Sequence, residues 1–247
     1  MTISVITVCF NSEETIGQTL KSVREQNNLG FNIELIVVDG NSTDKTLQII
    51  QEYSDVVSIC ISEPDNGIYD AMNKGWAVSS GDVVGFLNSD DYFASPDVLG
   101  RCVEVLSAES APDIVYGDID YVDREDRIVR KWRSGVQRPF RLGWHPPHPA
   151  FYAKRKTFDT AGGFDESFKI AADFDLMLRF MDVRNFSAAY IPAVMVKMRT
   201  GGASNSGWRS TISHAKELRS SFQKYDISPR AGYIYFRWMS KLLQHLR

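Results

Sequence analysis

The sequence predicts an α/β fold, with a mostly parallel sheet in its first half and a mixed second half. Over residues 1–90, short apolar segments rich in β-branched residues alternate with segments of helical period. Such alternation with short connections is typical of a parallel sheet with right-handed crossovers. From residue 96 onward the pattern changes to a helix followed by a charged hairpin and irregular segments. We therefore expect one α/β domain made of two unlike halves.

The first half is expected to contain four buried strands joined by three helices. Ser12 is a plausible N-cap for the first helix, and the acids Glu13 and Glu14 suit the positive end of that helix. The expected strands cover residues 3–10, 33–38, 56–61 and 83–87, and the expected helices cover residues 12–26, 44–53 and 68–79.

The second half is expected to mix short strands, helices and loops. A proline opens the helix expected over residues 96–107, and a charged turn separates two hairpin strands. The remaining expected elements are strands at 114–116, 121–122, 128–132, 150–152 and 188–198, helices at 172–181, 208–224 and 230–246, and loops at 137–149 and 200–207.

Composition excludes several classes of protein. The 247 residues are 43% hydrophobic and 24% charged with a net charge of -3, so neither disorder nor general nucleic-acid binding is indicated. The three cysteines lack CxxC spacing, which argues against a disulfide framework or a zinc site and favours a reducing cytosol. We expect no signal peptide and no spanning helix, because the N-terminus lacks a basic region and no apolar run reaches about 18 residues.

Polar and acidic side chains follow each of the four strands of the first half. Asn11, Asp39 and Asp65 follow the first three strands, and the run 88–91, Asn-Ser-Asp-Asp, follows the fourth. The carboxyl ends of parallel strands meet at one edge, where ligands bind. No GxGxxG, P-loop, GxSxG or HExxH motif is present. An acidic edge repels a bare pyrophosphate but accepts one that arrives with Mg²⁺ or Mn²⁺.

Four segments resemble glycosyltransferase family 2, inverting enzymes of GT-A fold. The segments are SVITVCFN at 4–11, IVVDGNSTDKT at 36–46, DNGIYDAMNKG at 65–75 through FLNSDDY at 86–92, and GGFDESFKIAADFDL at 162–176. The resemblance covers about residues 1–200. It implies a Rossmann-like, mostly parallel sheet that binds a nucleotide sugar, with a mixed acceptor-side half.

The resemblance also implies roles for residues in the first half. Asp39 and Asp65 would contact the uracil and ribose of the donor, with Phe10 packing on the base. Asp90 would be the principal ligand of Mn²⁺ or Mg²⁺ on the diphosphate. Asn88 stands where the family often has the first acid of an Asp-x-Asp pattern. We therefore expect weaker metal affinity, or a water between Asn88 and the metal.

A second departure concerns the catalytic base. Many relatives carry Glu-Asp where this chain reads Ala172-Asp173. Direct displacement needs a base for the acceptor hydroxyl, and Asp173 shares a helical face with apolar residues, so we expect it to be that base. The alternative is an N-cap role. Asp175 points elsewhere and is expected to bond the backbone or an arginine.

Two loops are further candidates for the site. In the segment 144–151, Trp144 and His148 suit sugar stacking or a hydrogen bond to phosphate, although a rigid solvated loop explains the prolines equally well. The glycine-containing loop 201–204 suits either a lid or an ordinary linker.

The end of the chain is basic. After Asp226 there are no acids, while Arg230, Arg237, Lys241 and Arg247 add four positive charges. A basic amphipathic helix within 227–247 is typical of a segment that lies on an anionic membrane. The alternative is a helix docked on the protein itself or in a dimer.

Together these observations predict a metal-dependent inverting glycosyltransferase of the hexosyltransferase class. It would move a sugar from a nucleotide diphosphate sugar, expected from the resemblance to be UDP-linked, to a hydroxyl of a glycan or polyprenyl-linked acceptor in surface polysaccharide assembly. We expect a catalytic domain at 1–226, with donor and acceptor halves meeting near residue 95, at the cytoplasmic membrane surface. Alternatives are a non-catalytic interaction subunit of the same fold, or a sugar-phosphate nucleotidyltransferase, whose glycine-rich, arginine-containing loop is absent.

Overall fold

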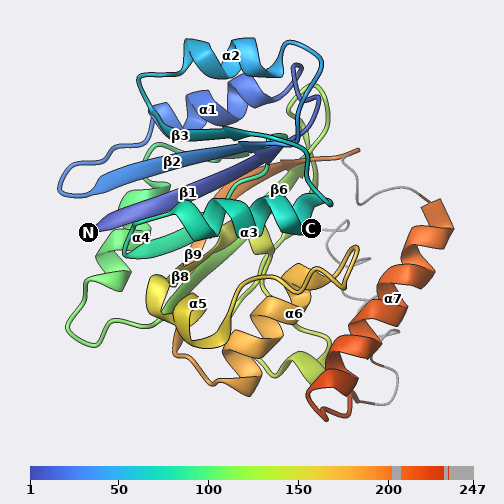
Figure 1. Ribbon diagram of the computed structural model, residues 1–247. Coiled ribbons are helices and arrows are strands. Elements are labelled where there is room, and N and C mark those ends of the chain that lie inside the picture. The colour runs from blue at the N-terminus through green and yellow to red at the C-terminus, as the bar shows by residue number, and fades with distance from the viewer. Residues whose placement is uncertain (202–206, 231–232, 234–247) are drawn as a thin grey trace.

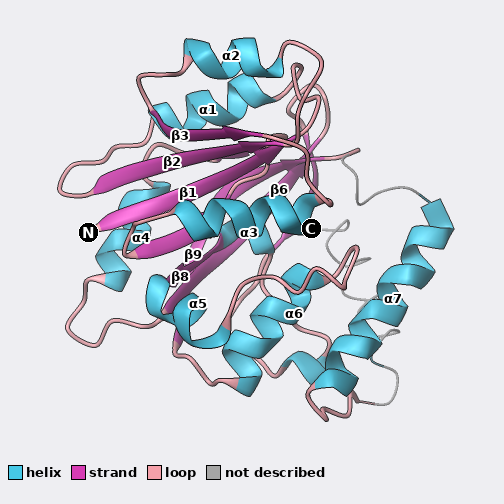
Figure 2. Cartoon of the chain, in the orientation of Figure 1, coloured by secondary structure: helices cyan, strands magenta, loops and turns pink. Residues whose placement is uncertain are grey.

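A single curled sheet runs through the computed structural model, which describes residues 1–201, 207–230 and 233 (Figures 1 and 2). Within these residues the strand order is β3-β2-β1-β4-β8-β6-β9-β5, and β7 pairs with β6 outside that path. The strands are β1 (Thr2–Cys9), β2 (Asn32–Asp39), β3 (Val57–Ser62), β4 (Val83–Phe86), β5 (Asp91–Phe93), β6 (Ile114–Val122), β7 (Ile128–Trp132), β8 (Phe151–Lys154) and β9 (Ala188–Arg199).

Strand direction confirms the predicted fold class, a mostly parallel sheet followed by a mixed one. β1 pairs in parallel with β2 and β4, and β2 pairs in parallel with β3. β8 then enters antiparallel between β4 and β6, and β5 lies antiparallel to β9 at the edge. The sheet is therefore parallel where the donor half was expected and mixed beyond it.

Helices cover both faces of this sheet, and alternate strand residues face each layer. Val5 belongs to a buried cluster with residues of α1, α2 and α4 on one face, whereas Ile6 belongs to a second cluster with residues of α3, α5 and α6 on the other. The helices are α1 (Ile16–Arg24), α2 (Thr46–Glu52), α3 (Ile68–Val78), α4 (Val98–Leu106), α5 (Arg155–Ala161), α6 (Ala172–Leu178) and α7 (Gly207–Lys224).

Several elements differ from expectation. α1 begins at Ile16, and the Ser12 side chain does not cap it; its hydroxyl lies 2.9 Å from that of Ser89. The helix predicted to end at 181 gives way after Leu178 to a π-helical turn, Arg179–Val183. The loop 137–149 contains two short 3₁₀ turns, Phe140–Leu142 and His148–Ala150. β5 and α5 were not predicted.

The C-terminal helix predicted over 230–246 lies outside the described residues, apart from two positions at its start. The N–H of Arg230 donates to the carbonyl of Arg141 at 3.0 Å, and the Tyr233 ring lies 5.1 Å from that of Phe222. The start of this segment is therefore docked on the domain. The loop 201–204, expected to be either a lid or an ordinary linker, also lies outside the described residues, except for Gly201. Among the helices that the structure describes, none has the length and apolar character needed to span a bilayer.

Candidate active site

A cavity of about 810 Å³ opens at the carboxyl ends of β1 and β4. Its far side is formed by β6, β7, the loop before β8 and the first turn of α6. Six of the residues predicted for the site line it: Phe10, Asp65, Asn88, Asp90, His148 and Asp173. Two others, Asp39 and Trp144, do not.

Close backbone packing brings Phe10 and Asp65 together at the donor end of the cavity. A Cβ on Gly40 would lie 2.5 Å from Oδ2 of Asp65, which would have to shift, and 3.5 Å from Cδ2 of Phe10, so both side chains lie beside the Gly40 backbone. The Phe10 ring is 61% exposed. A carboxylate beside an exposed aromatic ring can hold the polar edge and the flat face of a nucleoside.

Asp39 has a different place from the one expected. Its carboxylate is fully buried and accepts hydrogen bonds from the Ser42 N–H at 3.0 Å, the Ser62 hydroxyl at 2.7 Å and the Ser42 hydroxyl. This carboxylate fixes the 40–42 loop beside the cavity instead of lining the cavity, because three local donors already satisfy it.

The segment after β4 supplies hard oxygen donors. Burial raises the pKa of Asp90, and the charge of Arg199 opposes that rise. Asp91 is wholly buried, and burial together with the Asp90 charge raises its pKa well above the usual range. The amide oxygen of Asn88 is buried without a hydrogen-bond partner. Two neighbouring carboxyls and an unsatisfied amide oxygen favour a nearby cation.

These donors fit a metal that is shared with substrate. Among the described residues, no three histidine, cysteine, aspartate or glutamate side chains cluster to hold an ion by themselves. Mg²⁺ and similar ions are commonly held by one or two carboxylates plus substrate phosphates. Asp90, with Asn88 beside it, is such a partial ligand set.

Asp173 faces the cavity from the first turn of α6. One of its carboxylate oxygens accepts the N–H of Phe174 at 2.7 Å, and the N-cap position of α6 is Ala171. Buried His148 stacks on Phe86 with ring centroids 5.5 Å apart. Burial lowers the pKa of His148 while the Asp173 charge opposes this, so a neutral imidazole lies near the carboxylate.

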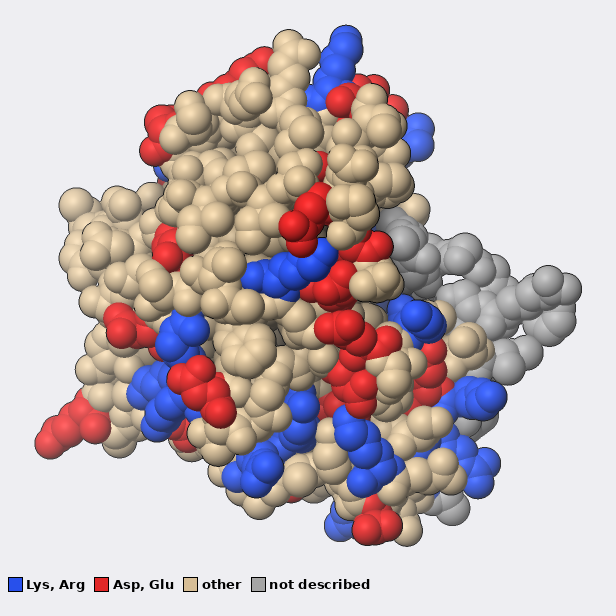
Figure 3. Space-filling model, in the orientation of Figure 1, with Lys and Arg blue, Asp and Glu red and all other residues tan. Residues whose placement is uncertain are grey.

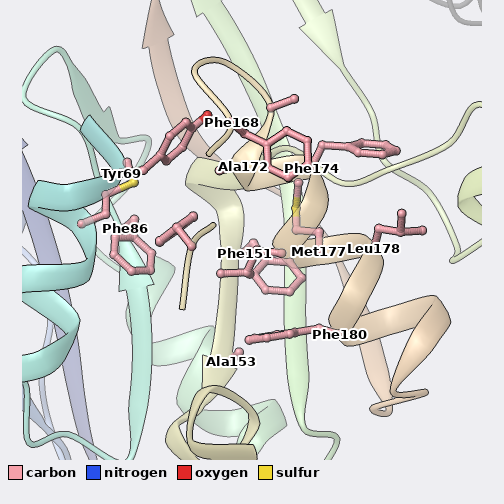
Figure 4. Packing of buried hydrophobic residues seen from close by; sticks show 14 of the residues in the cluster. Tyr69, Phe86, Phe151, Ala153, Phe168, Ala172, Phe174, Met177, Leu178 and Phe180 are labelled. Atoms are coloured by element: carbon pink, nitrogen blue, oxygen red, sulfur yellow. The ribbon is translucent and has the colours of Figure 1, made fainter. Parts of the chain in front are cut away.

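Hydrophobic packing against the core and hydrogen bonds with side chains of α7 hold the first turn of α6 in place. Figure 4 shows Phe174, Met177 and Phe180 of this segment in the buried hydrophobic cluster that also contains Phe86 and Phe151. Asp173 thus projects into the cavity from a backbone that is anchored in the core.

Asp175 bonds to α7 rather than to the backbone or an arginine. It is fully buried and accepts hydrogen bonds from Ser221 at 2.9 Å, Lys224 at 3.1 Å and Tyr225 at 3.1 Å. The sequence distance of about 46 to 50 residues hides these partners. Asp175 is therefore a structural link between the two helices.

Trp144 packs away from the cavity. Its indole N–H donates to the Ser134 carbonyl at 2.8 Å, and its ring lies 5.6 Å from those of Tyr116 and Phe140. The neighbouring His145 lines the cavity instead. The aromatic residue predicted to stack on sugar is thus half-buried and packs against the core.

Sequence reasoning missed the cavity's far wall. This wall includes Tyr121, Arg130, Trp132, His145, Arg199 and His214. The alternation within the predicted hairpin was a usable signal for Arg130 and Trp132, which lie two positions apart and so share a face. Arg199 and His214 carry no such signal.

Comparison with known proteins decides the family. The model of glycosyl transferase family 2 matches residues 4–173. The chain belongs to glycosyltransferase family 2. An uncharacterized glycosyltransferase of Mycobacterium tuberculosis is 38% identical over 186 residues, covering 72% of this chain and 68% of the relative. A PGL/p-HBAD biosynthesis glycosyltransferase of Mycobacterium bovis is 29% identical over 208 residues, covering 82% and 78%.

Solved structures confirm the GT-A fold of this family 2 glycosyltransferase. Residues 1–349 of S. aureus TarS in complex with UDP give a TM-score of 0.67 at 20% identity, covering 96% of this chain and 70% of TarS. Glucosyl-3-phosphoglycerate synthase from M. tuberculosis, solved with Mn²⁺ and UDP, gives 0.62 at 21% identity, covering 93% and 81%. The family match identifies the chain as an enzyme and favours neither a nucleotidyltransferase nor an interaction subunit.

Proposed function

We propose that this glycosyltransferase transfers a sugar from a UDP-sugar to a hydroxyl group, with inversion and with a divalent metal. The observation that supports this most strongly is the single cavity shared by Asp65, Asp90 and Asp173. Asp65 and Phe10 would hold the nucleoside. Asp90, with Asn88, would hold Mn²⁺ or Mg²⁺, which would neutralise charge on the diphosphate leaving group.

Asp173 is the proposed base. Its carboxylate would accept the proton of the acceptor hydroxyl as that oxygen attacks the anomeric carbon. The bond to the nucleoside diphosphate breaks on the opposite face, so the anomeric configuration inverts. Neutral His148 beside Asp173 would help to orient the hydroxyl without competing as a cation.

UDP is the proposed carrier because structures of similar fold are complexes with UDP or UDP-GlcNAc. A mannosyltransferase from Pyrobaculum calidifontis of similar fold is a complex with GDP-Man and Mn²⁺, so guanine donors belong in the test. A relative named for PGL/p-HBAD biosynthesis supports a glycan or lipid-linked acceptor in envelope assembly.

We also propose that the catalytic domain covers residues 1–226 and that the basic segment 227–247 contacts the inner face of the cytoplasmic membrane. The four positive charges after Asp226 support this. The docking of Arg230 and Tyr233 limits the membrane-facing part to residues beyond 233.

A donor screen tests the proposed function. Hydrolysis of UDP-, GDP- and dTDP-sugars is measured with Mn²⁺, with Mg²⁺ and with EDTA, and UDP binding is followed by calorimetry under the same conditions. We expect metal-dependent hydrolysis of one UDP-sugar and metal-dependent heat with UDP. Equal UDP affinity with Mn²⁺ and with EDTA would exclude the metal role.

A further inference from the structure

Five residues of the β6–β7 ribbon line the cavity, and four of them, all except Val129, lie on one face of the ribbon. Tyr121 pairs with Arg130 across the two strands, and Ile119 pairs with Trp132. Alternate residues of a strand point to the same face, and all four of these side chains line the cavity. This face belongs to the second half of the chain, opposite the donor residues that follow β1 and β4.

Arg130 is held on this face without a carboxylate partner. Its guanidinium carbon lies 3.6 Å from the ring centroid of Tyr121 and 6.0 Å from that of Trp132. Its Nε is buried and makes no hydrogen bond, and no acid within the described residues forms an ion pair with it. The ring orients the planar guanidinium but does not neutralise its charge.

Arg133 on the same ribbon shows the contrast. It lies 2.7 Å from Asp120 and 3.8 Å from Asp118, and it also donates to the Ile119 carbonyl at 3.0 Å. On the opposite face of the ribbon, the positive charge of Arg133 is therefore balanced by two carboxylates. Arg130 is half-buried, and a guanidinium partly removed from water without an anion carries a desolvation cost. The open partner position at Arg130 therefore suits an anion from outside the chain.

The donor diphosphate already has a different arginine near it. The charge of Arg199 acts on Asp90 and Asp91, where the metal and diphosphate are proposed to lie. Arg199 also lies 3.5 Å from Asp126. Arg130 lies on β7, across β6 from the β9 strand that ends at Arg199, and we assign it to the acceptor side of the cavity.

We propose that Arg130 binds an anionic group of the acceptor, a phosphate or a carboxylate, so that the enzyme selects a charged saccharide over a neutral one. This inference rests on the proposed function. A guanidinium offers two parallel N–H donors to such an oxyanion. Trp132 beside it would flank the apolar face of the sugar ring.

Calorimetry on the full chain tests this selection. The protein is saturated with UDP and Mn²⁺, which fills the donor site, and is titrated with glucose 1-phosphate, glucuronate and glucose. We expect one of the two anions to bind about tenfold more tightly than glucose or better. Which anion binds identifies phosphate or carboxylate as the recognised group.

Variants assign the preference to one side chain. Arg130→Gln should remove the preference for the anion, whereas Arg130→Lys should keep part of it, because lysine retains charge without the two-pronged geometry. Lys131→Gln is the matched control, since it removes the same charge from the opposite face of β7 and should change nothing.

Three results overturn the proposal: no anion preference in the wild-type protein, an unchanged preference in Arg130→Gln, or loss of UDP affinity in Arg130→Gln, which would place Arg130 in the donor site. Failure of the donor proposal is seen separately, as absence of UDP binding in the wild-type protein. In that case the anions are titrated without UDP. The proposal is then judged by the anion preference of the wild-type protein and of Arg130→Gln, as before.

Discussion

Asp39 and Asp90 show how a single residue's role depends on the donors around it. Both follow buried parallel strands, but Asp39 is surrounded by serine hydroxyls and one serine N–H. Asp90 has only partial compensation from Arg199, and burial raises its pKa. The first carboxylate stabilises a loop, whereas the second is available to a cation.

Asp90→Ala should abolish the metal dependence of UDP binding. Without this carboxylate the diphosphate has no anchored cation, so UDP affinity in Mn²⁺ should fall to its value in EDTA, a loss of about tenfold or more. Calorimetry measures both values, and Asp159→Ala, a change at an exposed acid on α5, is the control. Retained Mn²⁺-dependent affinity would remove Asp90 from the metal site.

Asp173→Asn should slow catalysis while leaving the donor in place. Asparagine keeps the size of the side chain but cannot take a proton, so kcat should fall by about 10² to 10⁴. UDP affinity should stay near the wild-type value. Asp175→Asn should instead lower the free energy of unfolding, because its buried carboxylate holds α7. Near-normal turnover in Asp173→Asn would show that another group is the base.

At the scale of elements, α7 holds the backbone of the turn that carries the proposed base, Asp173. Glu217 accepts the N–H groups of Lys169 at 3.2 Å, Ile170 at 2.9 Å and Ala171 at 3.0 Å. From the other side, the Tyr69 hydroxyl donates to the Ile170 carbonyl at 2.7 Å. Hydrogen bonds with side chains of α3 and α7 therefore hold the peptide just before α6, and Asp173 follows directly.

Glu217→Ala should misplace Asp173 without touching substrate. Three backbone donors lose their acceptor, which should cost about 1–3 kcal/mol of unfolding free energy. We expect kcat to fall while UDP affinity holds, and Glu217→Gln, which keeps one acceptor oxygen, to recover part of the rate. Urea unfolding and steady-state kinetics measure the two effects. If Glu217→Ala is destabilised but turns over normally, the hydrogen bonds of Glu217 stabilise the fold without positioning Asp173.

The ion pair between Asp165 and Lys224 makes a pH-dependent contribution to the stability of the fold. Burial opposes ionisation of Asp165, but hydrogen bonds from Lys224 and Ser167 lower its pKa to about 2 from an ordinary 3.8. A carboxyl with a lowered folded-state pKa stabilises the fold above the unfolded pKa, and this is lost as pH falls through the folded value. The stabilisation should thus disappear between about pH 4 and pH 2.

Asp165→Asn tests this link. At neutral pH the variant should be less stable by about 1 kcal/mol, because both partners are partly exposed and solvent screens the pair. The difference in urea unfolding free energy from wild type should shrink below pH 4 and vanish near pH 2. A difference that is constant over this range would assign the effect to packing rather than charge.

Local sequence signals predict the elements whose partners are near in the chain. Apolar runs with β-branched residues located β1 to β4 within a few residues, because burial on both faces marks them. β5 has only three residues and pairs with β9 about a hundred positions away, so no local period marks it. α5 carries two buried side chains, Thr157 and Phe158, and shows no apolar stripe.

The same distinction between near and distant partners applies to the residues of the candidate site. Strand-end reasoning located Phe10, Asp65 and Asn88 at the cavity, because parallel strands bring their carboxyl ends together. It could not place Trp144, whose core position depends on contacts with Tyr116 and the Ser134 carbonyl. Residues whose surroundings come from distant elements are decided by tertiary packing, which a local pattern does not contain.

At the scale of the whole molecule, charge is unevenly distributed. The net charge is only -3. Even so, acidic residues form a band on the face that carries α3 and α6, with basic residues around it (Figure 3). The cavity itself has acids on the donor side and Arg130 and Arg199 on the far side. Such polarity suits a donor that arrives with a cation and an acceptor that arrives with an anion.

The last fourteen residues add a positive charge of three, from Arg237, Lys241 and Arg247, beyond the docked Tyr233. Near an anionic surface each basic residue contributes about 1 kcal/mol, so three contribute roughly two orders of magnitude in affinity. Truncation after Tyr233 should therefore sharply reduce co-sedimentation with anionic vesicles. Hydrolysis of the donor should be unchanged, because all proposed donor and base residues precede this segment.

A charge-neutral variant separates electrostatic from apolar attachment. Changing Arg237, Lys241 and Arg247 to glutamine in the full-length protein keeps the aromatic residues Tyr235 and Trp238. If charge carries the binding, this variant should sediment like the truncated protein, and high salt should release the wild type from vesicles. Vesicle binding that resists both salt and the three substitutions would contradict electrostatic attachment. Loss of UDP affinity on truncation would show instead that the segment completes the folded domain.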